Sequence, residues 1–203
     1  MRAGAGSAKP RQVRGPKVQE AVLAATLAEL AEVGYTALTV EAVAQRAKVH
    51  KTTVYRRWPD RDALLIDALT DHAAAEVPIP DTGDIETDLH ELARSLVAMI
   101  STNPGDRAGM AAMASDAAHI PQVAEIKRRF YQDRFRRAEP VITRAIGRGE
   151  LPAGTDPSEV LKTLIAPIYL RLLVTAEPVD DTIADHAALV ALIAAQAGVL
   201  STR

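Results

Sequence analysis

The densest group of side chains that can contact a polyanion lies between residues 50 and 57. Lysine and arginine bind phosphate oxygens or guanine edges, threonine hydroxyls approach base edges closely, and a tyrosine hydroxyl can reach a phosphate. The groups of this kind are Lys51, Thr52, Thr53, Tyr55, Arg56 and Arg57. Val49, Val54 and Trp58 alternate with them at helical spacing, which predicts an opposite face turned towards a core. The run therefore predicts a short helix with one face that contacts nucleic acid.

Residues that could carry out catalysis or bind a metal are not grouped in this sequence. The five histidines are His50, His72, His90, His119 and His186, and no two of them lie within four residues of each other. The chain has no cysteine, which excludes disulfides, thiol chemistry and cysteine zinc sites. It also lacks a Gly-x-Ser-x-Gly element, a phosphate loop and a dinucleotide-binding glycine pattern. We therefore expect no enzyme activity, no metal and no cofactor.

Two short helices separated by a tight turn are predicted to position the polar face. Thr39 is a suitable N-cap for the first, which extends to about residue 47, and the second covers residues 51–57. A helix over 17–33, ended by Gly34, precedes them, and a helix from Asp60 to about residue 76 follows. Two short helices joined by a turn of three or four residues, with supporting helices on both sides, are typical of a helix-turn-helix, here residues 39–58.

The rest of the chain also predicts helices. A loop rich in proline at 77–83 is followed by helices at about 84–101, 105–115, 120–148, 157–175 and 182–199, and no segment shows the alternation of a strand. Apolar residues make up 48% of the chain and aromatic residues only 3%, a mixture that favours closely packed helices. We expect an all-α fold of about nine helices, with an N-terminal three-helix helix-turn-helix head and a C-terminal helical domain.

The charges divide the chain into a basic and an acidic part. Residues 1–61 carry 11 Lys and Arg against 5 Asp and Glu, a net charge of +6, and residues 62–203 carry −8. We interpret 1–16 as a flexible basic arm, 17–61 as the DNA-binding head and 62–203 as a ligand-binding and dimerisation domain. The arm can contact phosphates or act only as a solubilising tail. No apolar stretch reaches the roughly 18 residues needed to cross a bilayer, and the start lacks a secretory pattern, so we expect a cytoplasmic protein.

Two sets of apolar residues in the C-terminal domain are candidates for binding surfaces. A ligand cavity between helices is predicted to include Met99, Met110, Met113, His119, Tyr131, Phe135 and Tyr169. A dimer interface is predicted on two stripes, formed by Leu161, Leu164, Ile165, Ile168, Leu189, Leu192 and Ile193. The alternatives are that the methionines belong to an ordinary core, and that the stripes close the core of one chain. A basic run at 127–137 is expected to be a solvated helix face.

The N-terminal segments resemble the DNA-binding head of tetracycline-repressor-like (TetR/AcrR) regulators over about residues 18–66. The matching segments are 22–35, 39–44, 49–58 and 60–65, in the family's order and at its distances. The resemblance implies all-helical homodimers that bind operator half-sites with their heads and a small molecule with their larger C-terminal domains. It places Thr39, Lys51, Thr52, Thr53, Tyr55 and Arg61 at or beside DNA. From the residues themselves we also expect Lys17, His50, Arg56 and Arg57 to contact DNA. Trp58 falls at a core aromatic position.

The turn departs from the family pattern at two positions. Where the family usually has Gly, Val and Ser, this chain has Lys48, Val49 and His50. Lysine lacks the conformational freedom of glycine at positive φ, and histidine is a weaker helix cap than serine. We therefore expect a strained turn, and we do not transfer an operator sequence from relatives.

The sequence favours a DNA-binding transcriptional regulator, a repressor released from a double-stranded DNA operator by a small-molecule effector. The alternatives are an activator or ligand-independent regulator with the same head, and a small-molecule-binding helical protein or enzyme whose head mediates protein contacts. The basic head argues against the last alternative.

Overall fold

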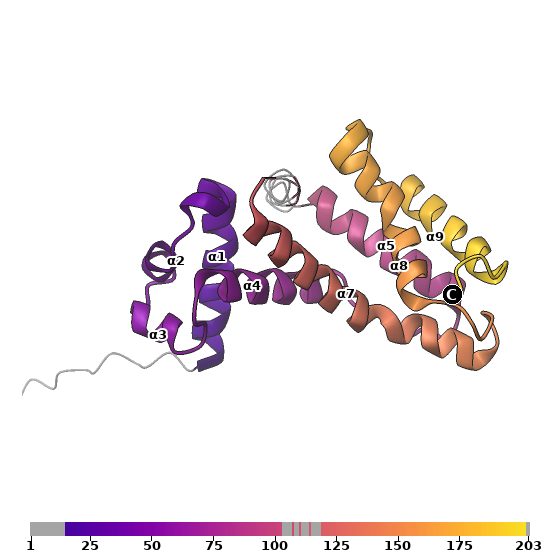
Figure 1. Cartoon of the computed structure of the whole chain (residues 1–203), viewed down its shortest axis with the longest axis horizontal. Coiled ribbons are helices and arrows are strands. Elements are labelled where there is room, and N and C mark those ends of the chain that lie inside the picture. Colours follow the sequence, from indigo (N-terminus) through magenta and orange to yellow (C-terminus); the bar gives the residue numbers. More distant parts are fainter. Residues whose placement is uncertain (1–14, 103–106, 108–109, 111–113, 115–118, 202–203) are drawn as a thin grey trace, which may run out of the picture.

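The computed structural model describes residues 15–102, 107, 110, 114 and 119–201, and this part of the chain is all-helical (Figure 1). Its helices are α1 (Gly15–Ala37), α2 (Val40–Arg46), α3 (Lys51–Tyr55), α4 (Arg61–Glu76), α5 (Ile85–Thr102), α7 (Pro121–Arg148), α8 (Pro157–Leu170), the π-helical segment η1 (Arg171–Thr175) and α9 (Asp181–Gln196). The predicted all-α architecture is confirmed. The predicted arm, apart from its last two residues, and most of the helix at 105–115 lie outside the described residues.

The head is formed by α1, α2, α3 and the first half of α4. Gly34 has a φ of +72°, so the regular helix of α1 ends there, as its sequence position predicts. Asp60 begins α4 by accepting a hydrogen bond from the amide of Ala63 at 2.8 Å. The head has its own buried core, whose members include Val22, Leu23, Leu38, Val43, Val54, Trp58, Leu64 and Leu65.

Helices α4 and α7 connect the head with the rest of the chain, which we call the body (Figure 1). Leu64, Leu65 and Ala68 of α4 pack in the head core, whereas Val77, directly after α4, packs in the body core. Val123 and Ile126 at the start of α7 are also in the head core. The two cores therefore do not separate at residue 61, where the charge pattern changes. They share two continuous helices, which can transmit a displacement from one core to the other.

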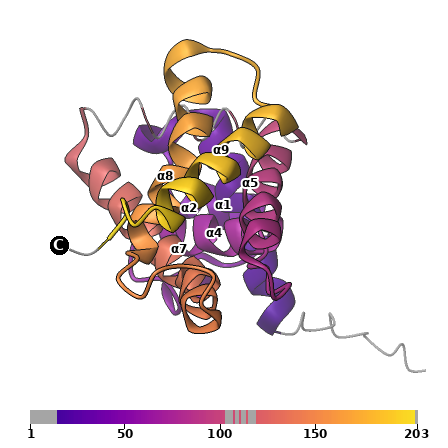
Figure 2. The same cartoon turned by 90° about the vertical axis from the view of Figure 1, so that its right-hand side faces the viewer.

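The body packs α5, α7, α8 and α9 around a second core (Figure 2). Helix α9 turns a row of small residues towards α5 and α8, formed by Ala184, Ala187, Ala188, Ala191 and Ala195. Such small side chains allow helix axes to approach closely, which fits the low aromatic content. Where one helix was predicted over 157–175, the structure has α8 followed by the π-helical turn η1. No helix in the described ranges is both long and apolar enough to cross a membrane.

Candidate nucleic-acid interface and body cavity

The turn between α2 and α3 is held by backbone and side-chain caps. Thr39 accepts a hydrogen bond from the amide of Ala42 at 3.1 Å, as its N-cap position predicts. Lys48 has a φ of +56°, and the amides of Lys48 and Val49 bond to the carbonyls of Gln45 and Ala44 at 3.1 and 2.9 Å. This is a Schellman-type helix end, which normally takes glycine at its left-handed position. The predicted strain at Lys48 is therefore present in the backbone.

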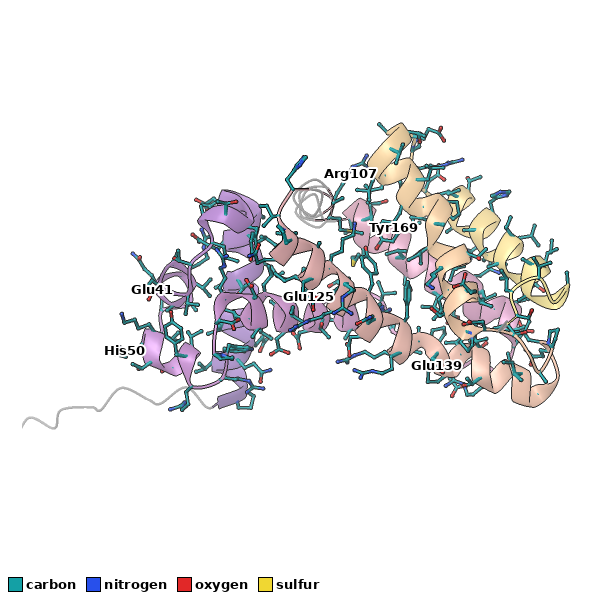
Figure 3. The ribbon with its side chains drawn as sticks, in the orientation of Figure 1. Glu41, His50, Arg107, Glu125, Glu139 and Tyr169 are labelled. Atoms are coloured by element: carbon teal, nitrogen blue, oxygen red, sulfur yellow. The ribbon has the colours of Figure 1, made fainter. Side chains whose placement is uncertain are left out.

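Helix α3 turns its two faces in opposite directions. Val54 is fully buried and Trp58, just after the helix, is 5% exposed, so the apolar face packs on the head core as predicted. The ring of Tyr55 is 45% exposed. Of the other polar residues, His50, Lys51, Thr52, Arg56 and Arg57 are exposed and Thr53 is half-buried. Figure 3 shows His50 at the outer edge of the head, directed away from the body. The result is a convex polar surface fixed on a rigid core.

Two hydrogen bonds between side chains fix the helices under this surface. The Trp58 Nε1–H donates to Asp67 Oδ2 at 2.9 Å, which holds the end of α3 against α4. The Tyr35 hydroxyl donates to Asp62 Oδ1 at 2.9 Å. Burial and the adjacent Asp62 carboxylate raise the pKa of Tyr35, so the phenol stays a donor at neutral pH.

A cavity of about 60 Å³ lies in the body between α4, α5, α7 and α8. It is lined by Ala73, Val77, Leu92, Leu96, Met99, Phe130, Tyr131, Arg134, Phe135, Ala138, Leu161, Leu164, Ile165 and Tyr169. Four of the seven predicted cavity residues are among these: Met99, Tyr131, Phe135 and Tyr169. Arg134 was not predicted in this cavity, although Tyr131, Arg134, Phe135 and Ala138 follow a spacing that places them on one helix face.

The polar groups of the cavity are two tyrosine hydroxyls and one guanidinium. The rings of Tyr131 and Tyr169 meet edge to face with centroids 5.9 Å apart, and their hydroxyls interact through a hydrogen bond. Burial raises the pKa of Tyr131, and raises that of Tyr169 well above its ordinary value. Burial also lowers the pKa of Arg134, whose guanidinium donates to the carbonyl of Val77. The cavity is thus an apolar space with polar groups on α7 and α8.

The chain matches known proteins along both of its parts. Residues 22–68 match the family described as bacterial regulatory proteins of the tetR family, and residues 79–191 match the tetracyclin repressor-like C-terminal domain. The chain belongs to the TetR family. Members of this family are transcriptional regulators with a DNA-binding helix-turn-helix, and they are not enzymes.

Relatives match over most of their own length. The HTH-type transcriptional regulator AqdR of Rhodococcus erythropolis is 37% identical over 174 residues, 85% of this chain and 83% of AqdR. The DNA-binding transcriptional repressor TetR of Mycobacteroides abscessus is 32% identical over 83% of this chain and 88% of its own. Among solved structures, the TetR family transcription regulator SCO0332 aligns with a TM-score of 0.72 and 29% identity, covering 87% of this chain and 97% of its own.

Among the residues that TetR-family resemblance places beside DNA, Arg61 differs from the rest. Its guanidinium donates to the carbonyls of Tyr35 and Leu38 at 3.3 and 3.2 Å and lies 4.3 Å from the centroid of the Tyr35 ring. These contacts attach the start of α4 to the turn between α1 and α2. Arg57 lies 5.5 Å from the centroid of the Trp58 ring, and Lys17 is exposed on the first turn of α1. Arg61 therefore stabilises the packing of α4 against α1 within the head, and its contact with DNA stays a prediction.

Two of the predicted cavity residues that the structure describes do not line the cavity. Met110 packs, partly buried, against the body core outside the cavity wall. His119 is exposed in the turn before α7, so its side chain faces solvent instead of the cavity. Met113 lies outside the described residues. The position of His119 just before a predicted helix did not indicate the direction in which its side chain points.

The predicted TetR-type dimer stripes divide into buried and exposed members. Leu161, Leu164, Ile168 and Leu192 are at most 6% exposed within one chain, so they are core residues and offer no surface to a partner. Ile165 lines the cavity. Leu189 and Ile193 on α9 are 46% and 56% exposed. Apolar side chains that sequence analysis did not select are exposed on the same two helices and their ends: Leu170, Val174 and Val190.

The basic run on α7 is neutralised by carboxylates on its own helix. Glu125 pairs with Arg128 and Arg129, and hydrogen bonds from these two arginines lower the pKa of Glu125 to about 2. Asp133 pairs with Arg136 and Arg137. These pairs are exposed and stabilise the helix only weakly. In the described part of the chain, no group of three histidine, aspartate or glutamate side chains is placed to hold a metal.

Proposed function

We propose that this TetR-family regulator is a homodimeric repressor that binds operator DNA through α3 and leaves it when a small-molecule effector enters the body cavity. The observation that carries the proposal is the exposed polar face of α3, formed by Lys51, Thr52 and Tyr55, above a fully buried Val54. A rigid helix of this kind fits the major groove of B-DNA. The 32% identity with a relative named as a repressor supports this direction of regulation.

On DNA, the residues of the polar face have different roles. Lys51, Thr52 and Thr53 at the N-terminal end of α3 contact base edges, because the first residues of a recognition helix enter the groove most deeply. Tyr55 and the N-cap Thr39 contact phosphates on either side. His50 stands at the start of α3 without a side-chain cap bond, so its ring is available to the DNA. Lys17, Arg56 and Arg57 add positive charge at the flanks.

The test of DNA binding uses duplexes selected from a random library by the purified protein. The double variant Lys51→Ala/Tyr55→Ala should bind the selected duplex at least about tenfold more weakly, because one base contact and one phosphate contact are removed. A control, Lys162→Ala, removes an exposed lysine from the body and should bind as the parent does. Fluorescence anisotropy at several salt concentrations measures both. Equal binding by a folded double variant, or affinity independent of salt, overturns the proposal and favours a head that contacts protein.

The proposed homodimer joins the exposed apolar residues of α9 and the end of α8. Leu189 and Ile193 are one helical turn apart and lie beside Val190, so the three form one surface. Two copies related by a twofold axis bury this surface as a four-helix bundle and present two heads to successive major grooves. Ile193→Glu should dissociate the dimer in analytical ultracentrifugation and weaken duplex binding. Val33→Glu, an exposed apolar site in the head, is the control and should leave the dimer intact.

The direction of regulation is the finer part of the proposal. If the effector prefers one spacing of the two heads and DNA prefers the other, DNA weakens effector binding. The effector must then weaken DNA binding by the same factor. A cell-based reporter behind the selected operator separates repressor, activator and ligand-independent regulator. Expression that rises on deleting the regulator supports repression. Expression that falls on deletion supports the activator alternative.

A further inference from the structure

Arg134 is an unusual arginine on α7. The arginines beside it are exposed and each pairs with a carboxylate one turn away: Arg128 and Arg129 with Glu125, Arg136 and Arg137 with Asp133. Arg134 instead lines the body cavity among aromatic and aliphatic side chains. Within the described ranges, its guanidinium donates to the carbonyl of Val77 and forms no ion pair. Its side-chain partner is thus a neutral carbonyl, although a guanidinium has five N–H donors and suits an anion.

Such an environment is unfavourable for the bare cation. Burial penalises the charged form of Arg134, and the carboxylate next to it in sequence, Asp133, is engaged by two other arginines. Arg134 is only half-buried, so solvent offsets part of this penalty, and an anion that forms charge-assisted hydrogen bonds to the guanidinium offsets the rest. The remaining walls provide leucine, methionine and phenylalanine side chains, which favour an apolar body. The site therefore matches a ligand with one anionic end.

Two tyrosines complete the polar part of the site. The Tyr131 and Tyr169 hydroxyls lie in the same cavity, and Tyr169 extends from α8 towards α7 (Figure 3). Burial raises the pKa of both phenols, so both stay protonated at neutral pH; one hydroxyl donates to the other, which leaves one hydroxyl hydrogen for a ligand. A hydroxyl donor without a negative charge nearby favours a ligand that has an acceptor oxygen. The cavity of about 60 Å³ has room for about four waters, so a larger ligand must displace side chains.

The acceptor that Arg134 now uses connects the cavity with the head. Val77 is the C-cap of α4 and also lines the cavity with Ala73, one turn before it. The other end of α4 is attached to the head by Arg61. An anion that draws the guanidinium further into the cavity would take it away from the Val77 carbonyl and so loosen the end of the helix that carries the head. The ligand then makes different contacts when the end of α4 is attached and when it is loosened. Any effector requires such a difference between two states.

We propose that the body cavity binds an amphipathic organic anion, an aromatic or alkyl body with one carboxylate, and that Arg134 determines this specificity and transmits binding to α4 through Val77. The proposal rests on the proposed function only in its last part, the effect on DNA. Anion binding itself can be measured without DNA.

The first experiment compares carboxylates with their neutral amides by calorimetry on the full-length protein. Two pairs of probes cover the two body types, 2-naphthoate with 2-naphthamide and decanoate with decanamide. At least one carboxylate should bind at least about tenfold more tightly than its amide, as expected for a charge-assisted bond in place of a neutral one. Equal affinity within both pairs, or no binding by any carboxylate, overturns the proposal.

The second experiment changes the arginine. Arg134→Met should bind carboxylate and amide with affinities that agree within about threefold, and Arg134→Lys should retain part of the preference. Arg136→Met, an exposed neighbour on the same helix, is the matched control and should keep the full preference. Circular dichroism and amide binding verify that each variant is folded. A full carboxylate preference in folded Arg134→Met overturns the assignment of the residue.

The third experiment separates this proposal from the proposed function. If the parent binds no selected duplex, the proposed function fails while the carboxylate preference still stands. If the parent binds duplex, saturating carboxylate should change its duplex affinity at least about fivefold, and this response should vanish in Arg134→Met. A duplex affinity that is the same with and without a bound carboxylate overturns the transmission through Val77.

Discussion

In both the head and the body, an arginine donates to backbone carbonyl groups at an end of α4. The arginine of the head has more partners than the arginine of the body. Arg61, at the start of α4, donates to two carbonyls, lies over the Tyr35 ring and approaches Asp62 Oδ1 at 3.4 Å. Arg134, beyond the other end, donates to the carbonyl of Val77 and lies in a cavity wall. A satisfied cation stiffens its surroundings, whereas an incompletely satisfied one can exchange its partner. We therefore propose that the head stays in place while the body responds to a ligand.

Exchanging each arginine for methionine tests this difference with the largest expected effect. Arg61→Met should lower the free energy of unfolding by about 2–3 kcal/mol, because it removes a donor from two carbonyls and a cation from an aromatic face. Arg134→Met should change it by less than about 1 kcal/mol, since an apolar side chain in an apolar cavity offsets the lost hydrogen bond. Urea unfolding followed by fluorescence of Trp58, the only tryptophan, and by circular dichroism measures both. Equal losses in the two variants contradict the comparison.

Removing one hydroxyl from each region gives the next effect. Tyr35→Phe should cost about 1.5 kcal/mol, because the hydroxyl donates to a carboxylate at 2.9 Å in a part-buried site. Tyr131→Phe should cost less than about 1 kcal/mol, since its partner is another neutral phenol. The same unfolding measurements apply. A larger loss for Tyr131→Phe indicates that the body is the stiffer region.

The turn of the head allows a gain in stability. Lys48 occupies a left-handed conformation that costs an L-residue about 1 kcal/mol relative to glycine, so Lys48→Gly should raise the free energy of unfolding by up to about that amount. Lys48 is exposed and outside α3, so duplex affinity should fall by no more than about threefold. Gln45→Gly, in the last turn of α2, is the control and should destabilise. A loss of stability in Lys48→Gly contradicts the strain.

The smallest effect is expected at the start of α3. His50 makes no side-chain cap bond, whereas serine at an N-cap bonds to an amide two or three residues on. His50→Ser should therefore stabilise the head by about 0.5 kcal/mol, and His50→Ala should not. Comparing duplex affinity in the two variants shows separately whether the imidazole contacts DNA. Stabilisation by alanine as large as by serine indicates that capping is not the cause.

The head could be predicted closely because its signals are local. The cap residues Thr39 and Asp60, the glycine at position 34 and the apolar positions of Val54 and Trp58 each act within one or two helical turns. The spacing of polar and apolar residues on α3 follows from helix geometry alone. The sequence therefore located the polar face before any tertiary contact was known. The strain at Lys48 followed from the same local reasoning.

The body shows what only the tertiary structure decided. Leu161, Leu164 and Leu192 carry the same apolar signal as Ile193, yet the first three are buried in one chain and the last is exposed, because helix neighbours decide which stripe is covered. Arg134 belongs to a basic run whose other arginines face solvent, and its angular position around the α7 axis places it in the cavity wall instead. Similarly, the sequence did not show that the guanidinium of Arg61, predicted beside DNA, also donates to the carbonyls of Tyr35 and Leu38. A residue type fixes what a side chain can bind, and packing between distant segments fixes which partner it meets.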